Sequence, residues 1–175
     1  MSEKVEIYIK HNEIMKAIEK MAEELNNEYG DKFPVFIVIL KGAFMFASEL
    51  MKRINCPLNI DFMTVSSYGP YTKSSGNVRI EEDIKINIEN RHVVIIEDII
   101  DTGQTVSKIK QKILVNNPLS LKLVTLLDKS SRRIVNENPD YRCFEIEDHF
   151  VVGFGLDYNQ MYRNLPYIGI LTEVK

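Results

Sequence analysis

One segment in the middle of the chain constrains the fold more than any other. Residues 93–96 are all β-branched, which is typical of a strand covered on both faces. Acids follow at Glu97, Asp98 and Asp101, and a small, hydroxyl-rich turn occupies residues 102–105. Apolar residues then recur at helical intervals, at Val106, Ile109, Ile113 and Leu114. The segment therefore predicts a strand, an acidic loop and a helix.

The start of this predicted helix favours a bound anion. Its first backbone N–H groups have no partner within the helix, and they lie at the positive end of the helix dipole. Glu97 and Asp98, just before it, can accept hydrogen bonds from a polyol or face a metal ion. An acidic edge beside an anion site suits a sugar phosphate.

Length and composition indicate a single globular domain, residues 1–175, in which 45% of the residues are hydrophobic. The net charge of −3 gives no sign of nucleic-acid or membrane-surface binding. The sequence has no apolar signal core or membrane-spanning run, and Cys56 and Cys143 lack metal-ligand spacing. We therefore expect a cytoplasmic protein with two reduced thiols.

Strands alternate with helices over residues 34–117, which predicts an α/β fold with a central, mostly parallel, twisted sheet flanked by helices. Strands are expected at residues 5–9, 35–40, 58–65, 119–127, 144–146, 150–155 and 167–171, with a strand pair within 78–88. Asn12 is expected to cap the first helix, and a second helix to run over residues 44–55. Residues 66–77 form a long polar loop of the kind that often closes over a site.

The candidate functional residues share one place in this predicted sheet. Lys41 and Gly42, residues 97–105 and Lys129 each follow a predicted parallel strand, and residues 150–157 form a later turn. Ligands of such sheets bind outside the carboxyl ends of the strands. The order of the elements therefore predicts one composite site.

Ordinary structural explanations compete with this one. They are solvated loop acids at Glu97, Asp98 and Asp101, a surface lysine at Lys41, a solvated charge run at Lys129 and Arg133, and a core position at Phe150. Gly42 favours the functional interpretation, because a glycine there lets backbone approach a ligand. The P-loop and dinucleotide-binding glycine motifs are both absent from the sequence.

The central segment resembles the phosphoribosyl-pyrophosphate motif of type I phosphoribosyltransferases: an apolar strand, two acids, two apolar residues and Asp-Thr-Gly-x-Thr. Nearly the whole chain is similar to the hypoxanthine-guanine members of that family, through Leu40-Lys41-Gly42-Ala43, Ser67-Tyr68, Lys129, Phe150-Val151-Val152-Gly153, and Leu156-Asp157-Tyr158-Asn159 with Arg163. The resemblance implies the family's fold, with a core of about residues 34–155 and a hood formed by the N-terminal segment and about residues 156–175.

The resemblance also implies an enzyme of purine salvage. With Mg²⁺ as cofactor, such an enzyme transfers the 5-phosphoribosyl group from phosphoribosyl pyrophosphate to hypoxanthine or guanine, giving IMP or GMP and pyrophosphate. Its partners are these small molecules and further copies of itself, as a homodimer or homotetramer, without nucleic acid or membrane. The residues leave open which 6-oxopurine is preferred, and whether dimer or tetramer forms.

Residue roles follow from the same resemblance. The 5′-phosphate is assigned to Asp101, Thr102, Gly103, Gln104 and Thr105, and the ribose is assigned to Glu97 and Asp98, directly or through Mg²⁺. The pyrophosphate is assigned to Lys41, Gly42 and Arg163, and the Mg²⁺ that it carries is assigned to Asp157. The purine is assigned to Lys129, Phe150 and Val151. Asp101 is expected to act as general base, and Ser67 and Tyr68 to belong to a closing catalytic loop. The peptide bond between Leu40 and Lys41 is expected to be cis.

Two other functions compete with this interpretation. Asp-Thr-Gly also occurs in aspartic proteases, but that class predicts a β-rich chain, whereas helical spacing follows the motif here. A non-catalytic regulator on the same fold predicts lost catalytic residues or a basic face, whereas Asp101 is present and the net charge is negative. We therefore expect a catalytic phosphoribosyltransferase.

Overall fold

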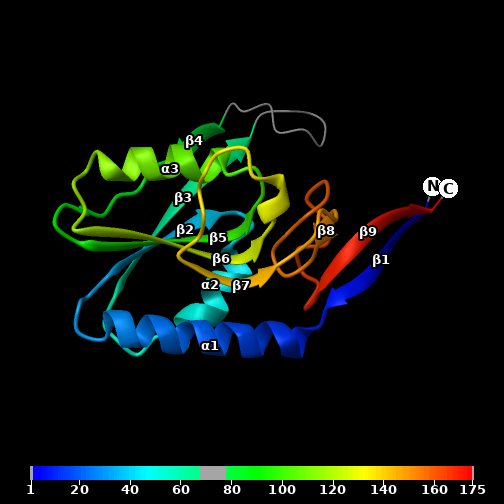
Figure 1. Cartoon of the computed structure of the whole chain (residues 1–175), viewed down its shortest axis with the longest axis horizontal. Helices are drawn as coiled ribbons and strands as arrows, with labels where there is room; N and C mark the ends of the chain where they lie inside the picture. Colours follow the sequence, from blue (N-terminus) through cyan, green and yellow to red (C-terminus); the bar gives the residue numbers. More distant parts are fainter. Residues whose placement is uncertain (1, 68–77, 175) are drawn as a thin grey trace.

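The computed structural model describes residues 2–67 and 78–174, and in these ranges a six-stranded sheet lies beside a smaller one (Figure 1). The large sheet has the order β4 (Val78–Glu82), β3 (Asn59–Ser67), β2 (Val35–Leu40), β5 (His92–Ile100), β6 (Ser120–Asp128) and β7 (Tyr141–Glu145). Its neighbouring strands are parallel, except that β4 is antiparallel to β3. The predicted α/β fold with a mostly parallel sheet is confirmed.

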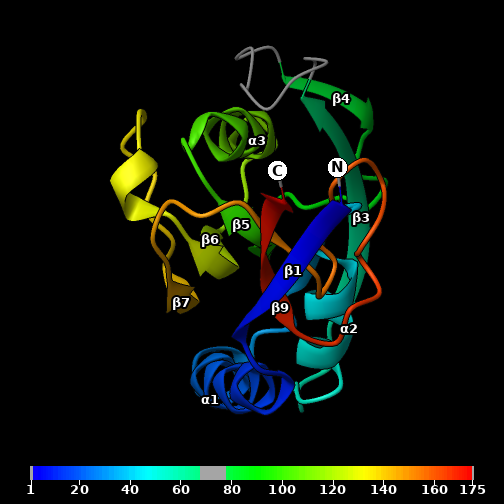
Figure 2. The ribbon, with the colours of Figure 1, turned by 90° about the vertical axis from the view of Figure 1, so that its right-hand side faces the viewer.

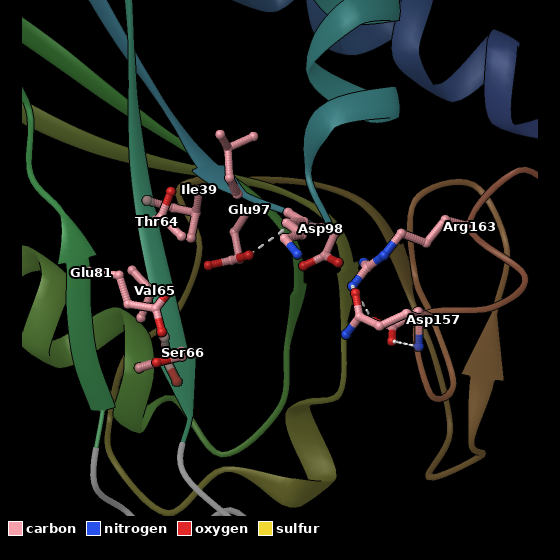
Figure 3. A pocket seen from close by; sticks show the side chains of 14 residues that line it. Ile39, Thr64, Val65, Ser66, Glu81, Glu97, Asp98, Asp157 and Arg163 are labelled. Atoms are coloured by element: carbon pink, nitrogen blue, oxygen red, sulfur yellow. Dashed lines mark hydrogen bonds and ion pairs between the residues drawn. The ribbon is translucent and has the colours of Figure 1, made fainter.

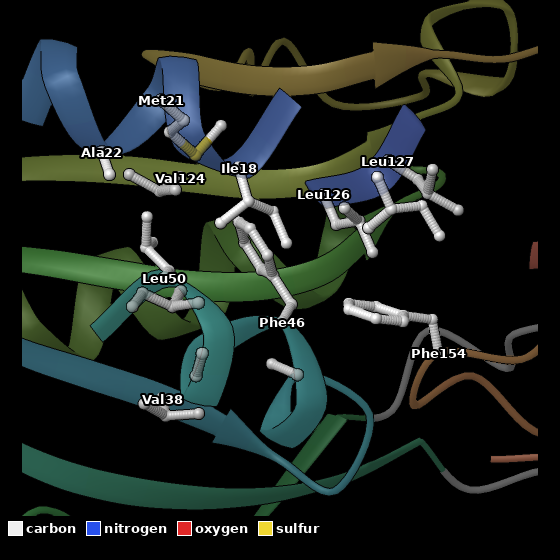
Figure 4. Close-up of a cluster of buried hydrophobic side chains, with 14 of the residues drawn as sticks. Ile18, Met21, Ala22, Val38, Phe46, Leu50, Val124, Leu126, Leu127 and Phe154 are labelled. Carbon is white, nitrogen blue, oxygen red and sulfur yellow. The ribbon is translucent and has the colours of Figure 1, made fainter. Parts of the chain in front are cut away.

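Helices cover both faces of this sheet. They are α1 (His11–Tyr29) and α2 (Phe44–Met51) on one face and α3 (Gln104–Leu114) on the other (Figure 1). Side chains alternate along a strand, so β2 contributes to both layers: Phe36 and Val38 pack with α1 and α2, while Ile37 and Ile39 pack with α3. Figure 4 shows the first of these layers, in which Phe46 of α2 lies among side chains from α1 and the sheet.

A small antiparallel sheet lies beyond the edge at which the parallel strands end (Figures 1 and 2). It has the order β1 (Ser2–Ile9), β9 (Ile168–Val174) and β8 (Val151–Val152). Strands from the two ends of the chain therefore lie side by side, and β9 carries β8 on its other edge. A short 3₁₀ helix, η1 (Ser130–Arg132), follows β6.

The central strand is longer than predicted. β5 continues to Ile100 because Ile99 and Ile100 keep pairing with β6, opposite Leu127 and Asp128. The expectation of an acidic loop from Glu97 onward was therefore wrong: the first two acids lie on the strand itself.

Other boundaries also differ from the predictions. Helix α1 begins at His11 rather than after Asn12, and the Glu13 carboxylate accepts a hydrogen bond of 2.9 Å from the backbone N–H of Lys10 at the cap. Helix α2 ends at Met51, because residues 52–55 turn before a proline.

The predicted strand pair within residues 78–88 contains one strand, β4. Beyond it, the Asp61 carboxylate accepts hydrogen bonds from the backbone of Lys85 and Ile86, which replaces strand pairing. Residues 66 and 67 belong to β3, and the rest of the predicted polar loop lies outside the described residues. In the part of the chain that the structure describes, no helix is long and apolar enough to cross a membrane.

Candidate active site

Three adjoining cavities lie where the parallel strands end, and Asp98 forms part of the wall of each. We name them by the element that opens into them: the β2 cavity of about 500 Å³, the β6 cavity of about 430 Å³ and the α3 cavity of about 290 Å³. A ligand with three parts that meet at one atom or ring could therefore extend into all three.

The β2 cavity brings together residues from distant parts of the chain. In Figure 3, Thr64, Val65, Ser66 and Glu81 lie on one side, Asp157 and Arg163 on the other, and Glu97 and Asp98 between them. Arg163 Nη2 and Asp157 Oδ1 form an ion pair of 2.6 Å. Lys41, exposed at the end of β2, and Gly42 complete this wall, so the cavity joins two cationic side chains with carboxylates.

Gly42 is required by a close contact. A Cβ atom at this position would lie 1.7 Å from Oδ2 of Asp98, a distance at which something must move. The peptide bond between Leu40 and Lys41, just before it, is cis, as expected. The backbone at the end of β2 therefore lies directly against a carboxylate that borders all three cavities.

Glu97 and Asp98 form an electrostatically unfavourable pair of adjacent acids. Glu97 is 7% exposed, and burial followed by the charge of Asp98 raises its pKa well above the usual value. Burial also raises the pKa of Asp98. A cation beside the two carboxylates would offset this cost, and oxygen ligands are the ones that Mg²⁺ prefers.

The three predicted magnesium ligands are not grouped in one cluster. Within residues 2–67 and 78–174, no three His, Cys, Asp or Glu side chains are grouped as metal ligands, so Asp157 does not join Glu97 and Asp98 in one cluster. Mg²⁺ commonly uses one or two protein carboxylates, with water and substrate phosphates as its other ligands. The pair Glu97 and Asp98 fits that donor set.

The α3 cavity lies at the start of a helix. Asp101, Thr102, Gly103 and Thr105 line it, and Gly103 adopts a left-handed conformation, with φ of 84°, just before the helix begins. Gln104, the first helical residue, is outside the lining residues of this cavity. The helix start thus offers backbone N–H groups to an anion, as the sequence predicted.

The segment that follows η1 supports the helix start from behind. The carbonyl oxygen of Thr102 accepts hydrogen bonds from the backbone N–H groups of Ile134 and Val135, at 3.0 and 3.1 Å. A Cβ atom at Gly103 would lie 3.0 Å from the Val135 carbonyl oxygen, so the turn and this segment pack closely.

The β6 cavity contains both apolar and charged groups. Asp101, Lys129, Phe150 and Val151 line it, and the side chain of Lys129 is 9% exposed. Phe150 is 43% exposed and makes an edge-to-face contact with Tyr158, with ring centroids 5.7 Å apart. The core position considered for Phe150 is therefore wrong, and its ring is available to a planar ligand.

Charged residues that the sequence assigned no role also lie here. Arg132 and Asp148 line the β6 cavity, and the side chain of Arg133 is 10% exposed, so Arg133 does not belong to a solvated charge run. It pairs with buried Asp128 and donates a hydrogen bond of 2.7 Å to the backbone oxygen of Asp101. The clue in the sequence was Asp128, an acid that ends an apolar strand five residues before an arginine.

Most predicted site residues therefore meet. All of those that the structure describes in full, apart from Gln104, line one of the three cavities. Tyr68 and the side chain of Ser67 lie outside the described residues.

Comparison with known proteins agrees with this geometry. Residues 4–159 match the family model of the phosphoribosyl transferase domain. The hypoxanthine-guanine phosphoribosyltransferase of Streptococcus pneumoniae is 46% identical over 95% of this chain and 93% of its own. The hypoxanthine phosphoribosyltransferase structure from Staphylococcus aureus has a TM-score of 0.90 at 45% identity, covering 95% of this chain and 91% of that one. A Bacillus anthracis hypoxanthine-guanine phosphoribosyltransferase structure has a TM-score of 0.91 at 34% identity, covering 98% and 100%. The chain therefore belongs to the phosphoribosyltransferase family, among its hypoxanthine-guanine members, because the family model matches most of the chain, its relatives are this similar in sequence, and the fold is shared.

Proposed function

We propose that this protein transfers the 5-phosphoribosyl group from phosphoribosyl pyrophosphate to hypoxanthine or guanine with Mg²⁺, as a step of purine salvage. The observation that carries the proposal is that three cavities of different chemistry meet at Asp98. One opens at a helix start, one contains Lys41 and Arg163, and one combines an exposed aromatic ring with a buried lysine. These match the 5′-phosphate, the pyrophosphate and the purine of the two substrates.

The phosphoribosyl half of the reaction is assigned to the α3 and β2 cavities. The first turn of α3, with Thr102, Gly103, Gln104 and Thr105, binds the 5′-phosphate. Glu97 and Asp98 bind the ribose hydroxyls, directly or through Mg²⁺. Lys41, Gly42 and Arg163 bind the pyrophosphate, and Asp157 would hold the Mg²⁺ that the pyrophosphate carries. Bound Mg²⁺ supplies positive charge that stabilises the leaving pyrophosphate.

The purine is assigned to the β6 cavity. Lys129 donates a hydrogen bond to the 6-oxo group, Phe150 stacks on the ring, and the backbone of Val151 binds the ring edge. Asp101 borders both the α3 and β6 cavities, and it accepts the proton that leaves the imidazole ring as the new bond forms. Ser67 and Tyr68 belong to a loop that excludes water from the reaction.

Incubation with phosphoribosyl pyrophosphate, Mg²⁺ and hypoxanthine is expected to give IMP, measured by its absorbance after chromatography. Adenine should react at least about 100-fold more slowly, because its 6-amino group would face the Lys129 donor. Removal of Mg²⁺ with EDTA should stop turnover, and added Mg²⁺ should restore it. Failure of the folded protein to form IMP would contradict the proposal.

Gly42→Ala is expected to lower kcat/KM for phosphoribosyl pyrophosphate by about 100-fold or more. The added methyl group displaces the Asp98 carboxylate, and a displacement of about 1 Å in a reacting site can cost that much. Gly30→Ala is a matched control, since its Cβ would meet one backbone oxygen at 3.0 Å, far from the site. Near-normal kinetics in Gly42→Ala would show that Asp98 needs no fixed position.

We also propose that residues 1–175 act as a single domain, with a core of about residues 34–155, a hood over it, and a cytoplasmic location. The free thiols Cys56 and Cys143 support that location.

The exposed apolar side chains of Phe44, Ile60 and Phe62 support a homodimer or homotetramer. Sedimentation velocity measures which assembly forms.

A further inference from the structure

Arg132 and Asp148 lie between the two residues assigned to the reactive edge of the purine. Arg132 Nε donates to Asp101 Oδ1 at 2.9 Å, and Arg132 Nη1 donates to Asp148 Oδ2 at 3.1 Å. Asp148 Oδ1 is 3.7 Å from Lys129 Nζ. All four side chains line the β6 cavity, so a row of alternating charges runs from Asp101 to Lys129.

The first contact orients a carboxylate. Because Arg132 engages Oδ1 of Asp101, it restrains the plane of that carboxylate without occupying Oδ2. A base in this role must lie within hydrogen-bond reach of the proton that it accepts.

The last contact balances a buried charge. The Lys129 side chain is 9% exposed, and an ammonium at that depth needs a nearby carboxylate. Among the described residues, Asp148 is the carboxylate within ion-pair distance of it. At 3.7 Å the pair is loose enough for the Lys129 ammonium to donate to a ligand as well.

The two ion pairs that Arg132 makes have little to do with folding. The side chains of Arg132, Asp101 and Asp148 are 41%, 42% and 52% exposed, and ion pairs this exposed contribute little to stability. Their position along the wall of a ligand cavity therefore needs another explanation.

We propose that Arg132 and Asp148 are positioning residues, forming a bridge that holds Asp101 and Lys129 at the separation of the imidazole N–H and the 6-oxo group of a 6-oxopurine. The inference rests on the proposed function. This imidazole N–H is the one at N7, which lies on the same edge of the purine as the 6-oxo group, so a single bridge behind that edge can align both protein groups at once. Neither Arg132 nor Asp148 needs to touch the purine for this effect.

The test compares steady-state kinetics of the full chain with hypoxanthine. Arg132→Leu is expected to lower kcat about tenfold and to leave KM for phosphoribosyl pyrophosphate within about twofold, because it disturbs orientation at the purine only. Arg132→Lys, which keeps the charge, should recover part of the loss. Asp148→Asn should raise KM for hypoxanthine about fivefold, because Lys129 loses its partner carboxylate.

The control is Arg53→Leu, which removes an arginine of similar exposure (32%) that pairs with Glu49 at 2.9 Å, away from the cavities. It should leave kcat unchanged. The Arg132 and Arg53 variants should melt within about 2–4 °C of the unmodified protein, since partly exposed ion pairs contribute little to folding. Unchanged kcat in Arg132→Leu, or equal losses for both substrates, would overturn the bridge while the proposed function stands. No IMP from the unmodified protein would overturn both.

Discussion

Asp101→Asn is expected to lower the turnover of hypoxanthine by about 10²- to 10⁴-fold while phosphoribosyl pyrophosphate still binds. An asparagine amide has the same shape as the carboxylate but cannot accept the purine proton. Asp101 borders both the α3 cavity and the β6 cavity, to which the 5′-phosphate and the purine are assigned in our proposal, so it is placed to accept that proton. Stopped-time assays measure kcat, and calorimetric titration with Mg²⁺ and phosphoribosyl pyrophosphate measures the retained binding.

A matched control is Asp83→Asn, which alters an acid of nearly equal exposure, 43%, paired at 2.8 Å with Lys112 in the last turn of α3. This variant should keep normal turnover. If Asp101→Asn behaves in the same way, Asp101 is not the base. If Asp101→Asn also loses phosphoribosyl pyrophosphate binding, its main role is in the anion site.

Asp128→Ala is expected to lower the free energy of unfolding by about 3–5 kcal/mol, because it leaves a buried arginine without a counter-charge. The Asp128 side chain is 1% exposed, and it pairs with Arg133 and, at 3.1 Å, with Arg142. Arg142 is 47% exposed and can turn to solvent, whereas Arg133 is 10% exposed and its Nε already has no partner among the described residues. Urea denaturation, followed by circular dichroism, measures the loss.

Glu145→Ala is the comparison for this variant. Glu145 pairs with the same Arg142 at 2.8 Å, but both side chains are nearly half exposed, so its removal should cost less than about 1 kcal/mol. If Asp128→Ala and Glu145→Ala lower the free energy of unfolding equally, the burial of Arg133 does not increase the cost of removing its counter-charge. Asp128→Ala should also weaken 5′-phosphate binding, since Arg133 holds the Asp101 backbone.

The sequence predicted the central strands well because their apolar patterns are local. The continuous apolar runs in β2, β5 and β6 each predict a strand that is covered on both faces. Parallel strands bring the residues at their carboxyl ends to one edge of the sheet. The convergence of Lys41, Asp98 and Lys129 therefore followed from element order alone. The same reasoning placed the anion site at the start of α3.

What the sequence missed depends on contacts between distant segments. Glu97 and Asp98 were expected in a loop because acids rarely occupy a buried strand, and only pairing with β6 keeps them there. Arg132 and Arg133 are adjacent, yet one lines the β6 cavity and the other pairs with a buried acid. The orientation of neighbouring side chains in a 3₁₀ turn cannot be predicted from charge alone.

The pairing of β1 with β9 sets the order in which the site can be assembled during synthesis. Glu3 lies opposite Glu173, so this sheet joins segments far apart in the sequence. Val151, which lines the β6 cavity, pairs with Ile170 of β9. Chains fold from the N-terminus as they leave the ribosome, and the large sheet needs nothing beyond β7. The α3 cavity can therefore form on a nascent chain, whereas the β6 cavity must wait until β9 has emerged.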